Sequence, residues 1–152
     1  MTVALPAGAA EIITRKKSLY CRLADTNDWD KIDQVLAPDL TFTAEDAEGK
    51  VININNTDYV FKSRADWVAY FSTIFASLQT MHQVGYPELE AVAPDEVKAT
   101  FGVTYLVGTK EADKGVHGTG AGHYYETWKL KDGDWFIQTV KFVRIYWKEM
   151  IL

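Results

Sequence analysis

The chain has 152 residues, a formal net charge of −5, 47% hydrophobic residues and 13% aromatic residues, which is typical of a single globular domain spanning residues 1–152. No basic run is longer than RKK at 15–17, so we expect neither nucleic acid nor a membrane as a partner. The single cysteine, Cys21, excludes an intrachain disulfide, and the N-terminus lacks the order of a signal peptide. We therefore expect a cytoplasmic protein.

Hydrophobic periodicity predicts three helices in the first half of the chain, over residues 10–25, 27–38 and 63–78. Asn27 is the expected N-cap of the second helix and Pro38 its stop, while Ser63 is the expected N-cap of the third. Two short strands are expected between the second and third helices, at 40–46 and 50–54.

Strand-forming runs dominate from residue 80 onward, at 80–93, 97–108, 123–130 and 135–148. The sequence KDGD at 131–134 predicts a tight hairpin turn, and the glycine-containing stretch 109–122 predicts a loop. Such runs favour an antiparallel meander. Helices followed by a curved antiparallel sheet make an α+β fold, in which three helices would close the sheet into a cone around a central cavity.

Three carboxylates, Asp25, Asp28 and Asp30, lie close together where the first helix is predicted to end. Asp28 and Asp30 would occupy the first turn of the second helix, where the helix dipole favours negative charge. Asp25 would lie at the end of the first helix, where negative charge is unfavourable. It is therefore either a cap of the following helix or a functional group.

His82 is the histidine whose surroundings favour chemistry. Alternate residues of a strand share a face, so His82, Val84 and Tyr86 are expected to point the same way. A histidine among apolar and aromatic neighbours is either a packed core residue or, when a carboxylate orients it, a general base.

No pattern in the sequence indicates a metal or a cofactor. The histidines at 82, 117 and 123 do not have the spacing of metal ligands, and His117 is expected to be solvated in a loop. The GTGAG stretch lies between strands, so it is no dinucleotide fingerprint. Cys21 is expected to be a packed helix residue. We therefore expect neither a metal nor a cofactor.

Three stretches together resemble a known family: YCRLADTNDWDKIDQVLAPDL, MHQVGYPELE and DGDWFIQTVKFVRIYWKE. They are similar to the SnoaL-like branch of the NTF2-like proteins, and within it to bile acid 7α-dehydratase and scytalone dehydratase, over residues 9 to 148. The resemblance implies three catalytic residues: His82 as the base, Asp25 as its partner and Tyr20 as a hydrogen-bond donor to a substrate oxygen. It also implies that Arg144 contacts a polar or anionic part of the substrate.

The chain departs from its resembled relatives at several polar positions. Ala44 stands where they have a pocket tyrosine, and Val107 or Gly108 where they have an aspartate or histidine. These differences predict a more apolar cavity, in which Tyr105, Tyr124 and Glu126 are the candidates to compensate for the missing polar groups, the two tyrosines as substrate contacts.

The resemblance implies a cofactor-independent dehydratase that acts on a hydroxylated polycyclic, aromatic or steroid-like substrate. Two alternatives remain: an isomerase or cyclase that uses the same residues, and a non-catalytic small-ligand-binding module. The resemblance also implies a homotrimer, or another homo-oligomer, formed through the outer face of the sheet. The alternating apolar residues expected on that face are Trp135, Ile137, Val143, Ile145 and Trp147.

Overall fold

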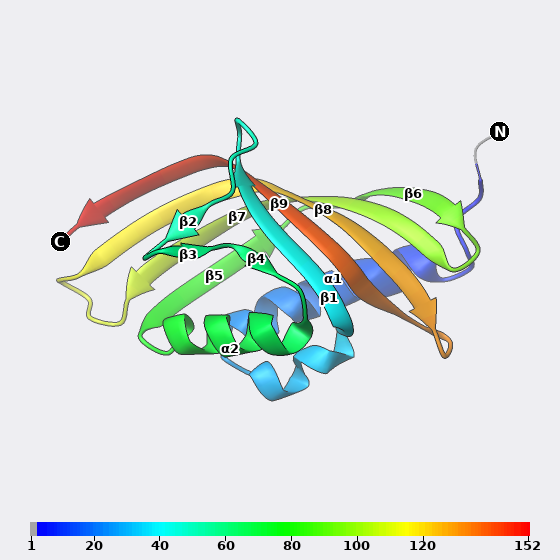
Figure 1. The fold of residues 1–152 in the computed structure, drawn as a ribbon, viewed down its shortest axis with the longest axis horizontal. Helices are drawn as coiled ribbons and strands as arrows, with labels where there is room; N and C mark the ends of the chain where they lie inside the picture. The colour runs from blue at the N-terminus through cyan, green and yellow to red at the C-terminus, as the bar shows by residue number, and fades with distance from the viewer. Residues whose placement is uncertain (1–2) are drawn as a thin grey trace.

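The computed structural model describes residues 3–152 and shows an α+β fold, as predicted (Figure 1). The helices are α1 (Ala9–Asp25), the short 3₁₀ helix η1 (Trp29–Gln34) and α2 (Arg64–Phe75). The first strands are β1 (Leu36–Asp46), β2 (Asn53–Ile54), β3 (Thr57–Asp58) and β4 (Val60–Phe61). The later strands are β5 (Leu78–Val84), β6 (Glu88–Ala93), β7 (Glu96–Thr109), β8 (Val116–Lys131) and β9 (Asp134–Ile151).

The main sheet runs in the order β4-β1-β9-β8-β7-β5, with β6 paired to β7 beyond the end of β5. Its long strands curve strongly, and the helices and the β2–β4 segment lie on the concave side (Figure 1). The predicted meander is correct for β7, β8 and β9, which pair antiparallel. The prediction of a wholly antiparallel sheet is wrong, because β1 pairs with β9 in parallel.

The hydrophobic core fills the space between the concave face of the sheet and the helices. Its largest fully buried apolar side chains are Trp128, Trp135, Phe101, Ile13 and Leu23. Helix α2 begins as predicted: the Ser63 hydroxyl accepts a hydrogen bond from the backbone N–H of Asp66 at 3.1 Å, which satisfies a donor that the first helical turn leaves free. Ile13 and Leu23 lie toward opposite ends of α1, so the core holds the whole length of this helix against the sheet.

The predicted second helix is largely wrong. Only η1 is helical, Asn27 adopts a left-handed conformation with φ of 57° rather than capping, and β1 already starts at Leu36. Pro38 therefore lies inside a strand. It falls where the register between β1 and β9 shifts, so its missing N–H removes no regular ladder bond.

The roles assigned to Asp28 and Asp30 change with that helix. Asp28 lies at the N-cap position of η1 without making a capping hydrogen bond, and its carboxylate instead accepts a bond from the Thr26 hydroxyl at 2.6 Å. Asp30 lies in the first turn of η1. Both carboxylates therefore belong to the segment between α1 and β1, and neither caps a second α-helix.

Two further predictions of strand boundaries are wrong. The run 80–93 breaks into β5 and β6, and Tyr86 lies between them with 95% of its surface exposed rather than on the face of His82. The stretch 109–122 is mostly strand, because β8 begins at Val116. The exposed side chain of His117 therefore belongs to a strand rather than a loop.

The expected outer apolar face is also wrong in part. Trp135 and Ile137 are 2% and 0% exposed and face the core. Trp147 lies 6.2 Å from Tyr105, on the inner face of the sheet. The pairing of β8 with β9 shifts between Thr127 and Trp128 and again between Ala121 and Gly122. Each shift inserts an extra residue into β9 and disrupts the simple alternation along the strand. No helix within residues 3–152 is long and apolar enough to cross a membrane.

Candidate functional site

Asp25 and His82 lie in direct contact, where the last residue of α1 meets the middle of β5. The Asp25 Oδ1 atom lies 2.6 Å from His82 Nδ1 and accepts a second hydrogen bond from the Thr80 hydroxyl at 2.8 Å. The other oxygen, Oδ2, accepts the backbone N–H of His82 at 2.9 Å. One carboxylate therefore holds both the backbone and the ring of the histidine. We call Asp25 and His82 the dyad.

This geometry determines which nitrogen of His82 carries the proton. A carboxylate can only accept hydrogen bonds, so Nδ1 must donate and the neutral ring then presents an unprotonated Nε2. The two side chains are 13% exposed for His82 and 10% exposed for Asp25. The pair is therefore shielded without being sealed from a small molecule.

Two aromatic rings flank the imidazole of His82. Phe75, at the end of α2, lies at a centroid distance of 6.3 Å with 23° between the planes. Tyr105 of β7 lies at 5.5 Å with 22° between the planes. These near-parallel neighbours restrict the ring to the plane that the Asp25 hydrogen bond selects.

Tyr20 lies five residues before Asp25 on α1 and is buried against Tyr124 of β8. The two rings meet edge to face at 6.1 Å. Burial raises the pKa of both phenols well above the ordinary value, so both hydroxyls stay protonated and can act as donors. Among residues 3–152, no hydrogen bond joins the Tyr20 hydroxyl to Asp25 or His82.

Glu126, a predicted candidate, forms a buried ion pair with Lys17 beneath these tyrosines, and the sequence did not predict this pair. Lys17 Nζ lies 2.6 Å from Glu126 Oε2, and both side chains are 0% exposed. The same ammonium lies 3.9 Å from the centre of the Tyr20 ring and 3.6 Å from that of Tyr124. Lys17 shares the inward face of α1 with Ile13 and Tyr20, and this spacing could have revealed that Lys17 is buried.

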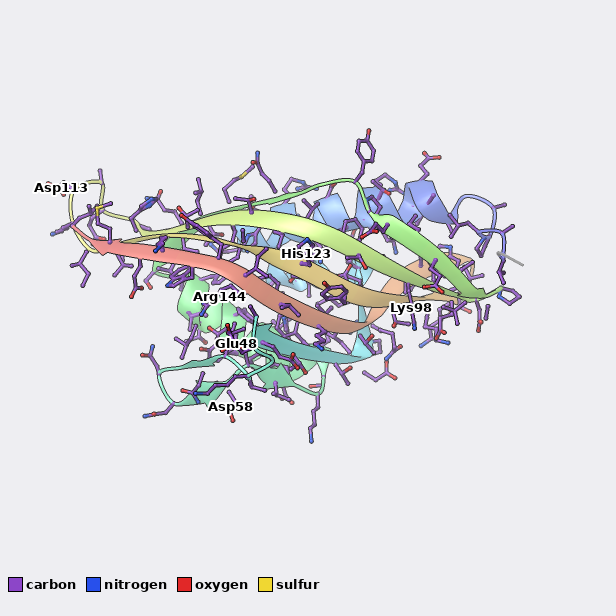
Figure 2. The ribbon with its side chains drawn as sticks, turned by 90° about the horizontal axis from the view of Figure 1, so that it is seen from above. Glu48, Asp58, Lys98, Asp113, His123 and Arg144 are labelled. Atoms are coloured by element: carbon purple, nitrogen blue, oxygen red, sulfur yellow. The ribbon has the colours of Figure 1, made fainter. Side chains whose placement is uncertain are left out.

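Arg144 and Tyr105 lie together on the concave side, near the dyad-bearing strand. Arg144 lies on β9, where β1 pairs beside it through Asp46 (Figure 2). Its guanidinium carbon is 5.3 Å from the centre of the Trp147 ring. Burial raises the pKa of Tyr105, and the nearby Arg144 charge opposes that rise. Of the three predicted substrate contacts, Tyr105 and Arg144 are neighbours, while Tyr124 lies with Tyr20.

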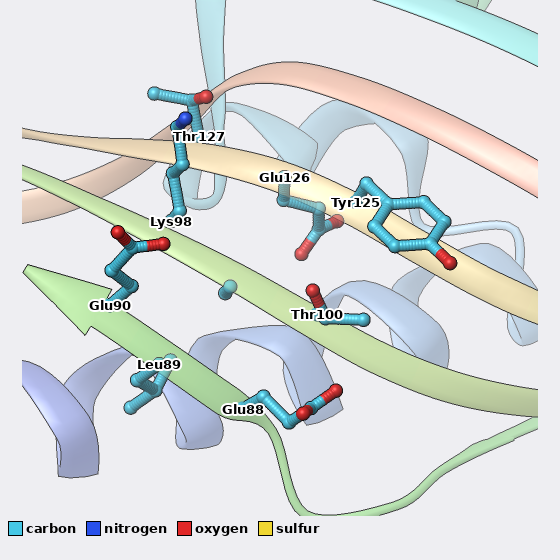
Figure 3. Close-up of a pocket in the computed structure, with 9 residues that line it drawn as sticks. Glu88, Leu89, Glu90, Lys98, Thr100, Tyr125, Glu126 and Thr127 are labelled. Carbon is cyan, nitrogen blue, oxygen red and sulfur yellow. The ribbon is translucent and has the colours of Figure 1, made fainter. Parts of the chain in front are cut away.

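Two hollows in the surface lie away from Asp25 and His82. One, of about 560 Å³, lies on β6, β7 and β8 and is lined by Glu88, Lys98 and Tyr125 among others (Figure 3). The other, of about 530 Å³, lies between η1 and α2. Neither is lined by Asp25 or His82, so a central cavity at the site stays a prediction. Within the part of the chain that the structure describes, no group of histidine, cysteine, aspartate and glutamate side chains could hold a metal ion.

Comparison with solved structures supports the fold. Over 92% of this chain and 88% of the other, it is similar to a hexachlorocyclohexane dehydrochlorinase from Novosphingobium barchaimii, with a TM-score of 0.71 and 16% identity. A protein from Kribbella flavida matches with a TM-score of 0.76 and 15% identity over 91% of both chains. At these identities the likeness concerns the fold alone.

Comparison of sequences gives the family. A probable cyclase of Gibberella zeae is 47% identical over 146 residues, which cover 96% of this chain and 97% of that protein. Residues 8–141 match the SnoaL-like domain. The curved sheet and these matches agree, and the chain belongs to the SnoaL-like family with its NTF2-like fold.

Proposed function

We propose that the protein is an enzyme that converts a small cyclic or polycyclic molecule by proton transfer, with His82 as the general base. The observation that carries the proposal is the 2.6 Å contact between Asp25 and His82 Nδ1. It fixes the tautomer that leaves Nε2 free to take a proton, and the carboxylate would stabilise the imidazolium that forms. In this scheme His82 is catalytic and Asp25 is a positioning residue.

The proposed reaction begins at a carbon next to a carbonyl group. His82 Nε2 removes a proton from that carbon, and the electron pair moves into an enolate. In a ring closure, the enolate carbon then attacks a second carbonyl of the same molecule, and the imidazolium returns its proton to the resulting alkoxide. Atoms balance without a leaving group. Positioned proton transfer of this kind contributes about 10²- to 10⁴-fold in rate.

Ring closure or isomerisation is our first choice of reaction. The relative that shares 47% of its residues with this chain is named a probable cyclase. The buried Ala44 also supplies no hydroxyl where the resembled dehydratases have a tyrosine. Both observations support a reaction that does not need to protonate a leaving group.

Dehydration is the second candidate, because Tyr105 stacks on His82 at 5.5 Å. Burial keeps its phenol protonated, so it could donate a proton to a departing hydroxyl of the same enolate. Mass spectrometry separates the two reactions: ring closure leaves the mass of the substrate unchanged, whereas dehydration removes one water.

The test is a screen of polycyclic ketones and hydroxyketones with the whole chain, followed by variants at the histidine. We expect His82→Gln to lower kcat by about 10²-fold or more, and His123→Gln to retain activity because His123 lies away from the dyad on β8. Asp25→Asn should lower kcat, change its pH profile and leave KM near the parent value. Full activity of His82→Gln on an identified substrate would overturn the proposal that His82 is the base.

We also propose that the protein is a homotrimer. Partly exposed apolar side chains remain on the strands at Met81, Leu106 and Tyr125, with exposures of 51%, 47% and 46%. Burial of such a patch against other copies would stabilise an assembly.

A further inference from the structure

The inward face of β5 carries a second polar side chain beside His82. Alternate residues of a strand point to the same face, so one partly buried row contains Leu78, Thr80, His82 and Val84. The first and last members of this row are apolar, as expected against the core. Thr80 and His82 are the two polar members, and both contact Asp25.

The hydroxyl of Thr80 finds its acceptor on α1 rather than on the sheet. Thr80 lies opposite Val107 of β7, whose side chain can neither donate nor accept a hydrogen bond. The hydroxyl instead donates to Asp25 Oδ1 at 2.8 Å. Because threonine is branched at Cβ, its side chain has few rotamers, and the hydroxyl is held in the direction of the carboxylate.

The sheet itself does not require this hydroxyl. Valine has nearly the same shape as threonine and is likewise favoured in strands. A hydroxyl at a partly buried position must lose water, and this loss is unfavourable unless a hydrogen bond replaces it. The polar group of Thr80 is therefore accounted for by Asp25 and not by the pairing of β5.

Thr80 and His82 meet the same oxygen of Asp25. His82 Nδ1 lies 2.6 Å from Oδ1, while Oδ2 accepts the backbone N–H of His82 at 2.9 Å. Without the Thr80 hydroxyl, this backbone N–H would be the one rigid donor left to the carboxylate, and Oδ1 would be free to turn away from the ring. An imidazole that loses this acceptor also loses its preference for a proton on Nδ1.

We propose that Thr80 is a positioning residue for the dyad: its hydroxyl keeps Asp25 Oδ1 against Nδ1, and thereby keeps Nε2 of His82 unprotonated. Thr80 acts through Asp25 and touches no reacting atom. A residue that merely tied α1 to β5 would contribute to stability and leave the imidazole unchanged. This inference rests on the proposed function, because it adds a residue to the same dyad.

Long-range ¹H–¹⁵N NMR of the whole chain tests the inference without a substrate, since the two ring nitrogens have different chemical shifts in each tautomer. The chain has three histidines, so His82→Gln assigns the signals of His82 and the other two serve as internal references. In the parent, the neutral ring of His82 should carry its proton on Nδ1. Thr80→Val should raise the share of the Nε2–H tautomer about tenfold, the change expected for one lost hydrogen bond to a charged group. Thr80→Ser should restore the parent spectrum.

Thr104→Val is the matched control. Thr104 is exposed on β7 and pairs with Gln83, which points to the opposite face from His82. The same substitution there should leave the tautomers of His82 unchanged. Circular dichroism checks that each variant folds. An unchanged His82 signal in Thr80→Val, or an equal change in Thr104→Val, would overturn the inference.

Turnover separates this inference from the proposed function. On an identified substrate, Thr80→Val should lower kcat about tenfold and leave KM near the parent value, while Thr80→Ser should retain most of the parent kcat. A parent-like kcat in Thr80→Val would remove the positioning role and leave His82 as the base. Full turnover by His82→Gln would remove the proposed reaction, and the NMR result would still decide whether Thr80 holds the dyad.

Discussion

Replacing Lys17 by methionine should destabilise the protein strongly, because the change leaves Glu126 buried without its cation. Methionine is similar in length to lysine but carries no charge. The variant loses the 2.6 Å ion pair with Glu126 and the cation's contacts with the Tyr20 and Tyr124 rings. Breaking one side of a buried pair typically costs about 3–5 kcal/mol, a large part of the total stability of a domain.

Urea unfolding followed by circular dichroism measures this loss. With a slope of about 2 kcal/mol per molar urea, a loss of about 4 kcal/mol moves the midpoint by about 2 M. The double variant Lys17→Met/Glu126→Gln should recover much of the loss, because it buries no charge. Its glutamine carbonyl can still accept the hydrogen bond that Trp128 Nε1 donates to Glu126 at 3.2 Å.

A surface pair provides the control. Lys129 and Glu96 lie 2.8 Å apart, but their side chains are 40% and 22% exposed, so Lys129→Met should shift the midpoint far less. The reasoning would be refuted if Lys17→Met and Lys129→Met behaved alike. It would also fail if the double variant were no more stable than Lys17→Met, since desolvated charge would then not be the cause.

The pH dependence of Lys17→Met provides a second check. Burial raises the pKa of Glu126 above its ordinary value of 4.5, and Lys17 opposes that rise. Without Lys17 the pKa rises further, so folded Glu126 binds its proton more tightly than the unfolded chain does. The loss of stability caused by Lys17→Met is therefore complete at pH values above the pKa of Glu126 in the folded variant. It shrinks as the pH falls through that pKa toward 4.5. The double variant should show no such recovery.

Three other variants or treatments test separate parts of the structure. Burial raises the pKa of Cys21 from 9.0 to about 11, so at pH 7 its thiolate fraction should be about 100-fold below that of an unfolded control, measured by iodoacetamide alkylation. Ser63→Ala should lower the free energy of urea unfolding by about 1 kcal/mol, and Ser63→Asp should not. Light scattering after gel filtration should give the mass of three copies, and Leu106→Lys should reduce it to one; a single-copy mass for the parent would contradict the trimer.

Local rules predicted the parts of the fold that depend on local chemistry. The hydroxyl cap at Ser63 is formed as expected. The turn between β8 and β9 has positive φ at Asp132 and Gly133, which is typical of the tight hairpin that the KDGD sequence indicates. Alternation of exposure along β5 also follows the expected strand pattern. In each case the responsible residues are neighbours in sequence.

Features that depend on distant partners could not be read from the sequence in the same way. Glycines in GTGAG indicate a loop by local propensity, but Gly118 and Gly120 lie in a strand because aromatic rings from β9 and β7 need their space. The parallel pairing of β1 with β9 likewise joins segments that are far apart in the chain. Glu126 met Lys17 across 109 residues, a pairing that no local pattern specifies.

The position of Asp25 at the end of α1 supports its role as the partner of His82 more strongly than its contacts alone do. A carboxylate in the last turn of α1 opposes the helix dipole, which costs about 0.3–1 kcal/mol at an exposed site. Three donors, the Thr80 hydroxyl, the backbone N–H of His82 and its ring Nδ1–H, offset this cost. Asparagine would avoid the charge and still accept hydrogen bonds, so helix stability does not require an aspartate there. Only the aspartate supplies a negative charge beside the imidazole. A base at His82 needs such a charge, because it stabilises the imidazolium that forms.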